Sequence, residues 1–220
     1  METLPKAQKT ELNQNTRGKF IVFEGIDGSG KSTQIALLEQ RLKAQGINVT
    51  KTAEPTNSGL GGLIRDALSG TTPRKPHELA AMFLADRISH NVSPIYGIKK
   101  LLNEGTYVIC DRYYYSSFAY QGIDADINWV MDMNLGCEEI TRPDVCIFLD
   151  IDPEQSAKRI GQSRAFLEIF EDTQTLQKIR SRFFDVFELI HHRENIKIID
   201  AARGIDEIAD DVFSAVNSSI

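Results

Sequence analysis

Eight residues of the chain, Gly25 to Ser32, fit the phosphate-loop pattern G-x-x-x-x-G-K-[ST]. They follow the apolar run Phe20–Phe23 and precede a helical pattern, and in this strand–turn–helix setting the motif binds polyphosphates. Backbone N–H groups close around phosphate oxygens, aided by the positive end of the helix dipole. Lys31 is expected to reach the β- and γ-phosphates, and the Ser32 hydroxyl to bind Mg²⁺. The alternative is a glycine turn before an ordinary helix. The expected phosphate contacts are Gly25, Ile26, Asp27, Gly28, Ser29, Gly30, Lys31, Ser32 and Thr33.

Asp111 and Arg112 form a second charged pair, directly after an apolar run. A carboxylate that ends an apolar strand is placed as a Walker-B aspartate is, so Asp111 is expected to act on Mg²⁺ or its waters. The planar fork of Arg112 suits bidentate contact with phosphate oxygens. The alternative for Arg112 is a surface arginine paired with Asp111 for stability.

Composition limits the class of protein. The chain has 220 residues, 41% hydrophobic, with a net charge of −6, which predicts one globular domain with a sizeable core. The acidic balance argues against a general nucleic-acid binder, which normally carries a basic excess. The three cysteines have neither metal-ligand nor paired spacing, and no apolar stretch is long enough to span a membrane. We therefore expect a cytoplasmic protein with a flexible tail over residues 1–17 and a domain over residues 18–220.

The order of β-like and helical segments predicts an α/β fold, in which a five-stranded parallel sheet carries helices on both faces. Pro94 is expected to break or kink the long middle helical stretch. Ligands of such sheets bind at the carboxyl ends of the strands. The expected strands are Phe20–Phe23, Val49–Ala53, Tyr107–Asp111, Val145–Asp150 and Ile196–Asp200. The expected helices are Ser32–Gln45, Gly61–Leu68, His77–Asn91, Pro94–Asn103, Asn128–Cys137, Pro153–Ile160, Thr173–His192 and Ile205–Asn217.

The segment Ile109–Gln121 reads I-C-D-R-Y-Y-Y-S-S-F-A-Y-Q. It resembles the signature of the thymidylate kinases, a family of P-loop nucleoside monophosphate kinases. The phosphate loop, the Glu54-Pro55 pair, the stretch from Phe83 to Arg87 and arginines near residue 160 extend the resemblance from about Phe20 to the C-terminus. The resemblance implies transfer of the γ-phosphoryl group of Mg-ATP to dTMP, releasing dTDP and ADP in dTTP biosynthesis. It also implies a homodimer.

The resemblance places the transferring phosphate against Arg112, and the 3′-hydroxyl and phosphate of dTMP against Asp27. The alternative for Asp27 is a residue that only solvates the turn. Glu54 is expected to help position the acceptor, or else to cap its loop. The acceptor phosphate has a second pKa near 6, so its attacking oxygen is already largely deprotonated at pH 7 and needs no general base. The histidines are therefore expected to be surface or helix-end residues without a catalytic role: His77, His90, His191 and His192.

Phe83 and Arg87 lie four residues apart, so both can face one pocket from one side of a helix. The resemblance implies that Phe83 stacks on thymine and that Arg87 hydrogen-bonds a thymine carbonyl; alone, Phe83 fits a core position equally well. Ser117 and Gln121 match positions that face the imide edge, and Tyr120 matches the residue that disfavours a 2′-hydroxyl. The expected dTMP contacts are Asp27, Glu54, Phe83, Arg87, Arg112, Tyr113, Ser116, Ser117, Tyr120 and Gln121.

Because the phosphate loop has Gly28 and Ser29 where one branch of the family has an arginine, the resemblance implies the lid-arginine type. The lid is expected at about residues 161–170, with Arg164 as the first candidate for transfer and Arg159 as the second. Arg159 could instead cap the preceding helix. Glu171 could touch the waters of Mg²⁺ or start the next helix.

The segment Ala53-Glu54-Pro55 departs from the family pattern, which often has arginine before Glu-Pro. Either a phosphate contact is missing or Arg65 supplies it. Two other functions remain open at this point. One is a kinase for UMP, CMP or AMP, and the other is a non-catalytic P-loop protein; Ser117, Tyr120 and Gln121 argue against the first, and the presence of Lys31 and Arg112 against the second.

Overall fold

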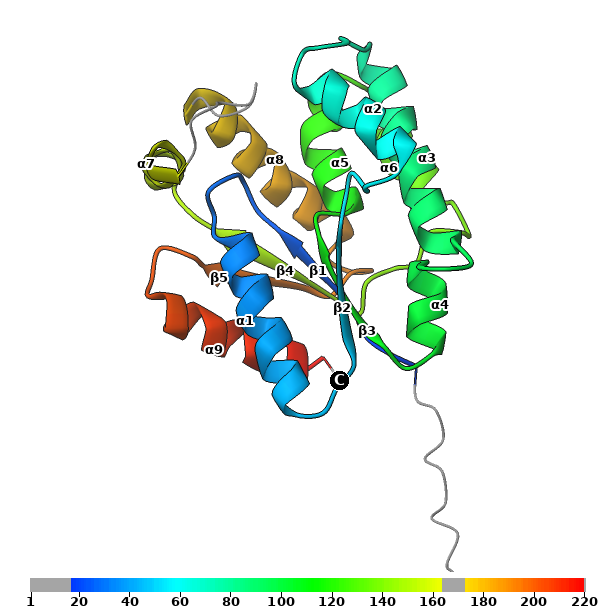
Figure 1. Cartoon of the computed structure of the whole chain (residues 1–220). Coiled ribbons are helices and arrows are strands. Elements are labelled where there is room, and N and C mark those ends of the chain that lie inside the picture. Colours follow the sequence, from blue (N-terminus) through cyan, green and yellow to red (C-terminus); the bar gives the residue numbers. More distant parts are fainter. Residues whose placement is uncertain (1–16, 164–172, 220) are drawn as a thin grey trace, which may run out of the picture.

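The computed structural model describes residues 17–163 and 173–219. Within these ranges, five parallel strands form one sheet in the order β2-β3-β1-β4-β5 (Figure 1). The strands are β1 (Phe20–Glu24), β2 (Val49–Ala53), β3 (Tyr107–Asp111), β4 (Val145–Asp150) and β5 (Ile196–Asp200). The predicted parallel sheet is confirmed, and β1 continues to Glu24, one residue beyond the expected end.

Helices cover both faces of the sheet. α1 and α9 pack together on one face and α5 and α8 on the other, while α2 packs on α3 beyond the β2 edge (Figure 1). The helices are α1 (Lys31–Ala44), α2 (Gly59–Leu68), α3 (Pro76–Val92), α4 (Ile98–Asn103), α5 (Tyr114–Tyr120), α6 (Ile127–Leu135), α7 (Pro153–Ser163), α8 (Thr173–Ile190) and α9 (Ile205–Asn217). This three-layer arrangement confirms the predicted fold class.

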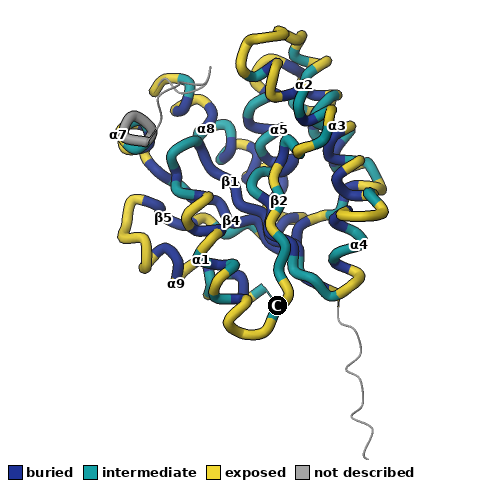
Figure 2. Tube along the Cα trace, viewed as in Figure 1, coloured by how far each residue is buried: buried dark blue, intermediate teal, exposed yellow. Residues whose placement is uncertain are grey.

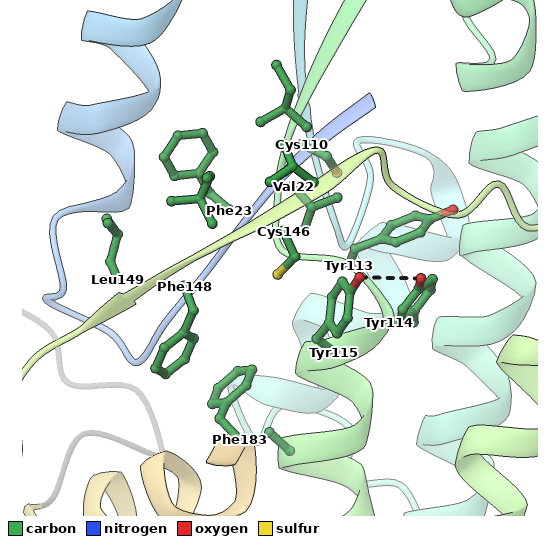
Figure 3. Packing of buried hydrophobic residues seen from close by; sticks show 14 of the residues in the cluster. Val22, Phe23, Cys110, Tyr113, Tyr114, Tyr115, Cys146, Phe148, Leu149 and Phe183 are labelled. Atoms are coloured by element: carbon green, nitrogen blue, oxygen red, sulfur yellow. Dashed lines mark hydrogen bonds between the residues drawn. The ribbon is translucent and has the colours of Figure 1, made fainter. Parts of the chain in front are cut away.

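The central strands are buried on both sides, as parallel strands between two helical layers must be. Every residue of β1 is buried, whereas the edge strands β2 and β5 are partly exposed (Figure 2). Aromatic rings fill the layer between the sheet and α5 and α8, with Phe148 of β4 packed against Phe183 of α8 (Figure 3). Cys110 and Cys146 lie in this core as free thiols.

Several helix ends differ by a few residues from the expected ones, and α7 runs to Ser163, so the first residues of the lid expected at about 161–170 are helical. Two segments differ more. The helix expected to start at Pro94 begins at Ile98, because the chain turns through Pro94–Tyr96 before the N-cap Gly97. Helix α5 was not expected, since its run of tyrosines and serines has weak helix propensity. It is stabilised instead by packing against α8 and by the Glu24 carboxylate, which accepts hydrogen bonds from the backbone N–H groups of Tyr113 and Ser116.

None of the described helices is both long enough and apolar enough to cross a membrane.

Candidate active site

A cavity of about 690 Å³ lies at the carboxyl ends of the strands, a size typical of ligand sites. The phosphate loop and α1 form one part of its wall, and α3 and α5 form the other. The ends of β2 and β3 supply charged residues there, Glu54 and the pair Asp111 and Arg112, where ligands of parallel sheets bind. The predicted site residues that line it are Asp27, Gly28, Gly30, Lys31, Ser32, Thr33, Glu54, Phe83, Arg87, Asp111, Arg112, Tyr113, Ser116, Tyr120, Gln121 and Arg159.

The phosphate loop turns through residues with positive φ at Gly25, Gly28 and Gly30. At Gly25, a Cβ would lie 2.7 Å from the Leu149 carbonyl oxygen, so only glycine fits. The Lys31 ammonium fills the loop and donates to the carbonyl oxygens of Gly25 and Ile26, at 3.0 and 3.2 Å. Burial lowers its pKa to about 8, so the group is still mainly charged at pH 7. Of the other expected contacts, Ile26 and Ser29 are buried beneath the cavity wall.

Arg112 stands where β3 meets the loop before α5. Its backbone has φ 66, a conformation that non-glycine residues rarely adopt outside functional sites. The guanidinium donates from Nη2 to Asp27 Oδ1 at 2.6 Å and from Nη1 to Ser116 Oγ at 3.0 Å. It also lies over the Tyr120 ring, 5.1 Å from the centroid. The partner of Arg112 is therefore Asp27 of the phosphate loop, and no ion pair with Asp111 is present among the described residues.

Asp111 lies beside Arg112, and its buried Oδ1 has no hydrogen-bond partner in the part of the chain that the structure describes. Such an atom fits a cation or its water, because a buried carboxylate oxygen is rarely left unsatisfied. Ser32 lines the same cavity. No group of three or more metal-ligating side chains occurs within residues 17–163 and 173–219. Mg²⁺ is commonly held by one or two protein carboxylates together with phosphates and water, and the Asp111 oxygen could supply such a contact.

Arg87 lies at the opposite end of the cavity from the phosphate loop, and only 1% of its side chain is exposed. Its Nε donates to Glu54 Oε2 at 2.7 Å, Nη1 to Asn134 Oδ1 and Nη2 to Ser117 Oγ at 3.1 Å. A guanidinium has five N–H groups, and these three bonds leave two of them without a hydrogen-bond partner among the described residues. Phe83 lines the cavity one helical turn before Arg87, as expected.

Of the two residues expected at the imide edge of the base, only one lines the cavity. Gln121 does so, whereas Ser117 is buried behind Arg87. Tyr113 contributes its ring to the wall, while its hydroxyl points away, accepting from Asn91 and donating to the Thr141 carbonyl oxygen. The neighbouring rings of Tyr114 and Tyr115 are core residues, and their hydroxyls meet at Glu194.

His90 was expected on the surface or at a helix end; it lies in the last turn of α3, but it is buried rather than on the surface. It is 4% exposed and lies between Glu54 Oε1, at 3.0 Å from Nδ1, and Thr52 Oγ1, at 2.7 Å from Nε2. Glu54 thus touches both His90 and Arg87, and its carboxylate is held inside the protein. The other histidines are exposed, as expected.

Asp86, to which no role was predicted, fixes the loop after β2. It accepts hydrogen bonds from the backbone N–H and hydroxyl of Thr56 and from the Ser58 hydroxyl. The only hint of this role in the sequence was its position inside the Phe83–Arg87 stretch. Arg65 donates to the carbonyl oxygens of Pro55 and Thr56 and lines the cavity; that it replaces the arginine absent at Ala53 stays a prediction.

Glu24 was also missed, because it closes an apolar strand and reads as part of it. It is fully buried, and burial raises its pKa to about 6 even though Arg112 and Ser116 lower it. Arg159 belongs to α7, lines the cavity and donates to the Ala201 carbonyl oxygen. Arg164 and Glu171 lie outside the described residues.

Comparison with known proteins gives one consistent family. The thymidylate kinase family model matches residues 23–212. The chain is 36% identical over 215 residues to a probable thymidylate kinase of Pyrococcus horikoshii, covering 93% of this chain and 98% of that one. It is 44% identical over 169 residues to a probable thymidylate kinase of Methanococcus aeolicus, covering 76% and 79%.

The thymidylate kinase of Desulfotalea psychrophila is 35% identical over 209 residues, covering 92% of this chain and 96% of that one. Among solved structures, the thymidylate kinase of Candida albicans superposes with a TM-score of 0.79 at 25% identity, covering 92% of both chains.

Proposed function

Because the chain belongs to the thymidylate kinase family, we propose that it transfers the γ-phosphoryl group of ATP to dTMP, forming ADP and dTDP. The observation that carries the proposal is the composition of the cavity. It is lined at once by a phosphate loop and, at its other end, by Phe83 and Arg87. A P-loop protein that binds a single nucleotide needs only the phosphate loop. A further wall with an aromatic ring and an arginine suits a second ligand, the acceptor nucleotide.

The ATP side of the site consists of the phosphate loop and the first turn of α1. Lys31 now donates to two loop carbonyl oxygens, and we expect it to exchange them for β- and γ-phosphate oxygens. Gly25 to Thr33 would surround the phosphates with backbone N–H groups. When bound, Mg²⁺ would supply positive charge that offsets the negative charge of the phosphates. Ser32 and Asp111 are the described residues placed to hold it, and Glu171 is a further candidate.

The acceptor phosphate would occupy the space in front of Arg112. The fork of Arg112 suits two phosphate oxygens, and Asp27 holds it in place from the other side of the cleft. The Asp27 carboxylate would accept a hydrogen bond from the 3′-hydroxyl. Tyr120 lies beneath Arg112, where it would exclude a 2′-hydroxyl. Arg159 and Arg164 would add positive charge as the phosphoryl group moves.

The base would lie between Phe83 and the wall formed by Tyr113 and Gln121. Arg87 would donate one of its remaining N–H groups to a thymine carbonyl oxygen. Glu54 and Ser117 contribute by holding Arg87 rather than by touching the base, according to their contacts. Ser116 faces the cavity beside Arg112. A pocket built to hydrogen-bond one base edge discriminates strongly against bases that leave its donors unpaired.

The experiment that tests the proposal is ADP release by the purified protein with Mg-ATP and a panel of dTMP, dUMP, ribo-TMP, CMP, UMP and AMP. We expect a clear preference for dTMP. Preference for another monophosphate would keep the phosphate chemistry and overturn the assignment of the base pocket. No acceptor-dependent release would overturn the proposed activity.

A further inference from the structure

Glu24 is a buried charged residue next to the phosphate loop to which the proposed reaction gives no role. It is the last residue of β1, it is fully buried, and it precedes the phosphate loop. Burying a carboxylate is unfavourable unless hydrogen bonds or opposite charges compensate. Its contacts therefore indicate what it is kept for.

Among the described residues, the Glu24 carboxylate accepts three hydrogen bonds, all from the segment that follows Arg112. Oε1 accepts from the backbone N–H of Tyr113 at 2.8 Å and of Ser116 at 3.1 Å. Oε2 accepts from the Ser116 hydroxyl at 2.6 Å. That hydroxyl oxygen in turn accepts from Nη1 of Arg112 at 3.0 Å. A continuous chain thus runs from the Glu24 carboxylate through Ser116 to the Arg112 guanidinium.

The same residues fix the backbone of Arg112. Its φ of 66 is unfavourable for a residue with a side chain. The Phe23 carbonyl oxygen accepts the Arg112 N–H at 2.9 Å, and Glu24 accepts the next N–H along the chain. Two consecutive residues of β1 therefore hold the turn from which the Arg112 side chain enters the cavity.

We propose that Glu24 is a positioning residue for phosphoryl transfer, holding Arg112 toward the reacting phosphate through the Ser116 hydroxyl and the backbone of Tyr113. The proposal rests on the proposed function, since it assigns Glu24 to the same reaction. The negative charge of Glu24 also attracts the Arg112 guanidinium. The other charged groups near Arg112 are Lys31, Asp27 and Asp111.

Glu24→Gln separates this role from simple packing. The amide oxygen can still accept both backbone N–H groups, which keeps α5 in place. The amide nitrogen only donates, so it competes with Arg112 for the Ser116 oxygen, and the negative charge is lost. Ser116→Ala is the second variant; it leaves the carboxylate and its backbone contacts and removes only the link to Arg112. Tyr114→Phe is the matched control, a buried hydroxyl on the same helix that contacts Glu194 instead.

The test is a double-mutant cycle of Glu24→Gln and Arg112→Ala, measured as ADP release with saturating Mg-ATP and dTMP. Misplacing a catalytic group by about 1 Å can lower the rate about 100-fold, so Glu24→Gln should lower kcat about 10- to 100-fold with little change in KM for ATP. Ser116→Ala should lower kcat in the same direction, and Tyr114→Phe should retain it. In the Arg112→Ala background, Glu24→Gln should have almost no further effect.

An equal loss in both backgrounds, or wild-type kcat in Glu24→Gln, would overturn the proposal. If the wild-type protein turns over an acceptor other than dTMP, the proposed substrate fails and the cycle is run with that acceptor. If no acceptor is turned over, the crystal structure of Glu24→Gln decides the inference alone. A displaced Arg112 guanidinium supports it, and an Arg112 that keeps its contact with Asp27 and its left-handed backbone overturns it.

Discussion

The two ends of the cavity each present an arginine paired with a carboxylate, yet the two pairs differ in burial. At the base end, the side chains of Arg87 and Glu54 are 1% and 2% exposed, whereas at the phosphate end those of Arg112 and Asp27 are 19% and 24% exposed. The base end is thus fixed before any ligand arrives, while the phosphate end is open to water and to exchange of partners. A rigid base pocket suits discrimination between nucleotide bases. An accessible arginine suits the stabilisation of a phosphoryl group during its transfer.

The largest expected effect comes from removing Arg87. Arg87→Met should lower the free energy of unfolding by about 3 to 5 kcal/mol, because it leaves the Glu54 charge buried without its partner. Chemical denaturation measures this loss. The double variant Arg87→Met with Glu54→Gln should recover much of the stability. A small loss in the single variant would contradict the view of a preformed, dry base end.

Arg112→Ala should act on turnover more than on folding. Losing one preorganised donor to a developing charge typically lowers kcat about 100- to 1,000-fold, and ATP binding should persist because Lys31 and the phosphate loop are untouched. Steady-state kinetics and calorimetry with an ATP analogue measure the two effects. Arg112→Lys is the matched control; it keeps the charge without the bidentate fork, and we expect it to restore only part of the rate. Wild-type turnover in Arg112→Ala would remove Arg112 from the reaction.

The pH dependence of stability reports on Glu24. Burial raises its pKa from 4.5 to about 6, so the folded protein takes up this proton before the unfolded chain does. The contribution of Glu24 to stability therefore rises as pH falls from about 6 to 4.5, and its burial penalty is fully present at pH 7. The shift corresponds to about 2 kcal/mol.

The measured quantity is the free energy of unfolding of the wild type minus that of Glu24→Gln. This difference should increase by about this amount when the pH is lowered from 7 to 4.5. Denaturation curves of both proteins at the two pH values measure it, and groups that titrate alike in both cancel. A difference that does not change with pH would mean that Glu24 does not titrate in this range.

The smallest expected effect distinguishes residues that hold Arg87 in place from residues that contact the base. Ser117→Ala removes one hydrogen bond from Arg87 but nothing from the cavity wall. A hydrogen bond contributes about 1 kcal/mol, so KM for dTMP should rise about fivefold with kcat little changed. Gln121→Ala, which removes a side chain that lines the cavity, is the comparison. A larger effect of Ser117→Ala than of Gln121→Ala would show that Ser117 contacts the base directly.

The sequence by itself determined the elements and much of the inventory of the site. Hydrophobic runs marked the strands, because strands between two helical layers must be apolar. The phosphate loop and the four-residue spacing of Phe83 and Arg87 are local patterns, readable without knowing the fold. Where local signals were weak, as in the tyrosine-rich α5, the helix was not predicted, because tertiary packing overrides helix propensity.

Only the tertiary structure decided which groups meet. Asp27 and Arg112 are 85 residues apart and pair because β3 lies beside β1 in the sheet. The same strand order places Glu24 under Ser116, and the packing of α3 buries His90 between Thr52 and Glu54. A residue such as Glu24 gives no periodic or motif signal of its own, since its role depends on which strand end is its neighbour. Strand order is set by how the whole chain buries its apolar faces, and no local window of sequence contains that information.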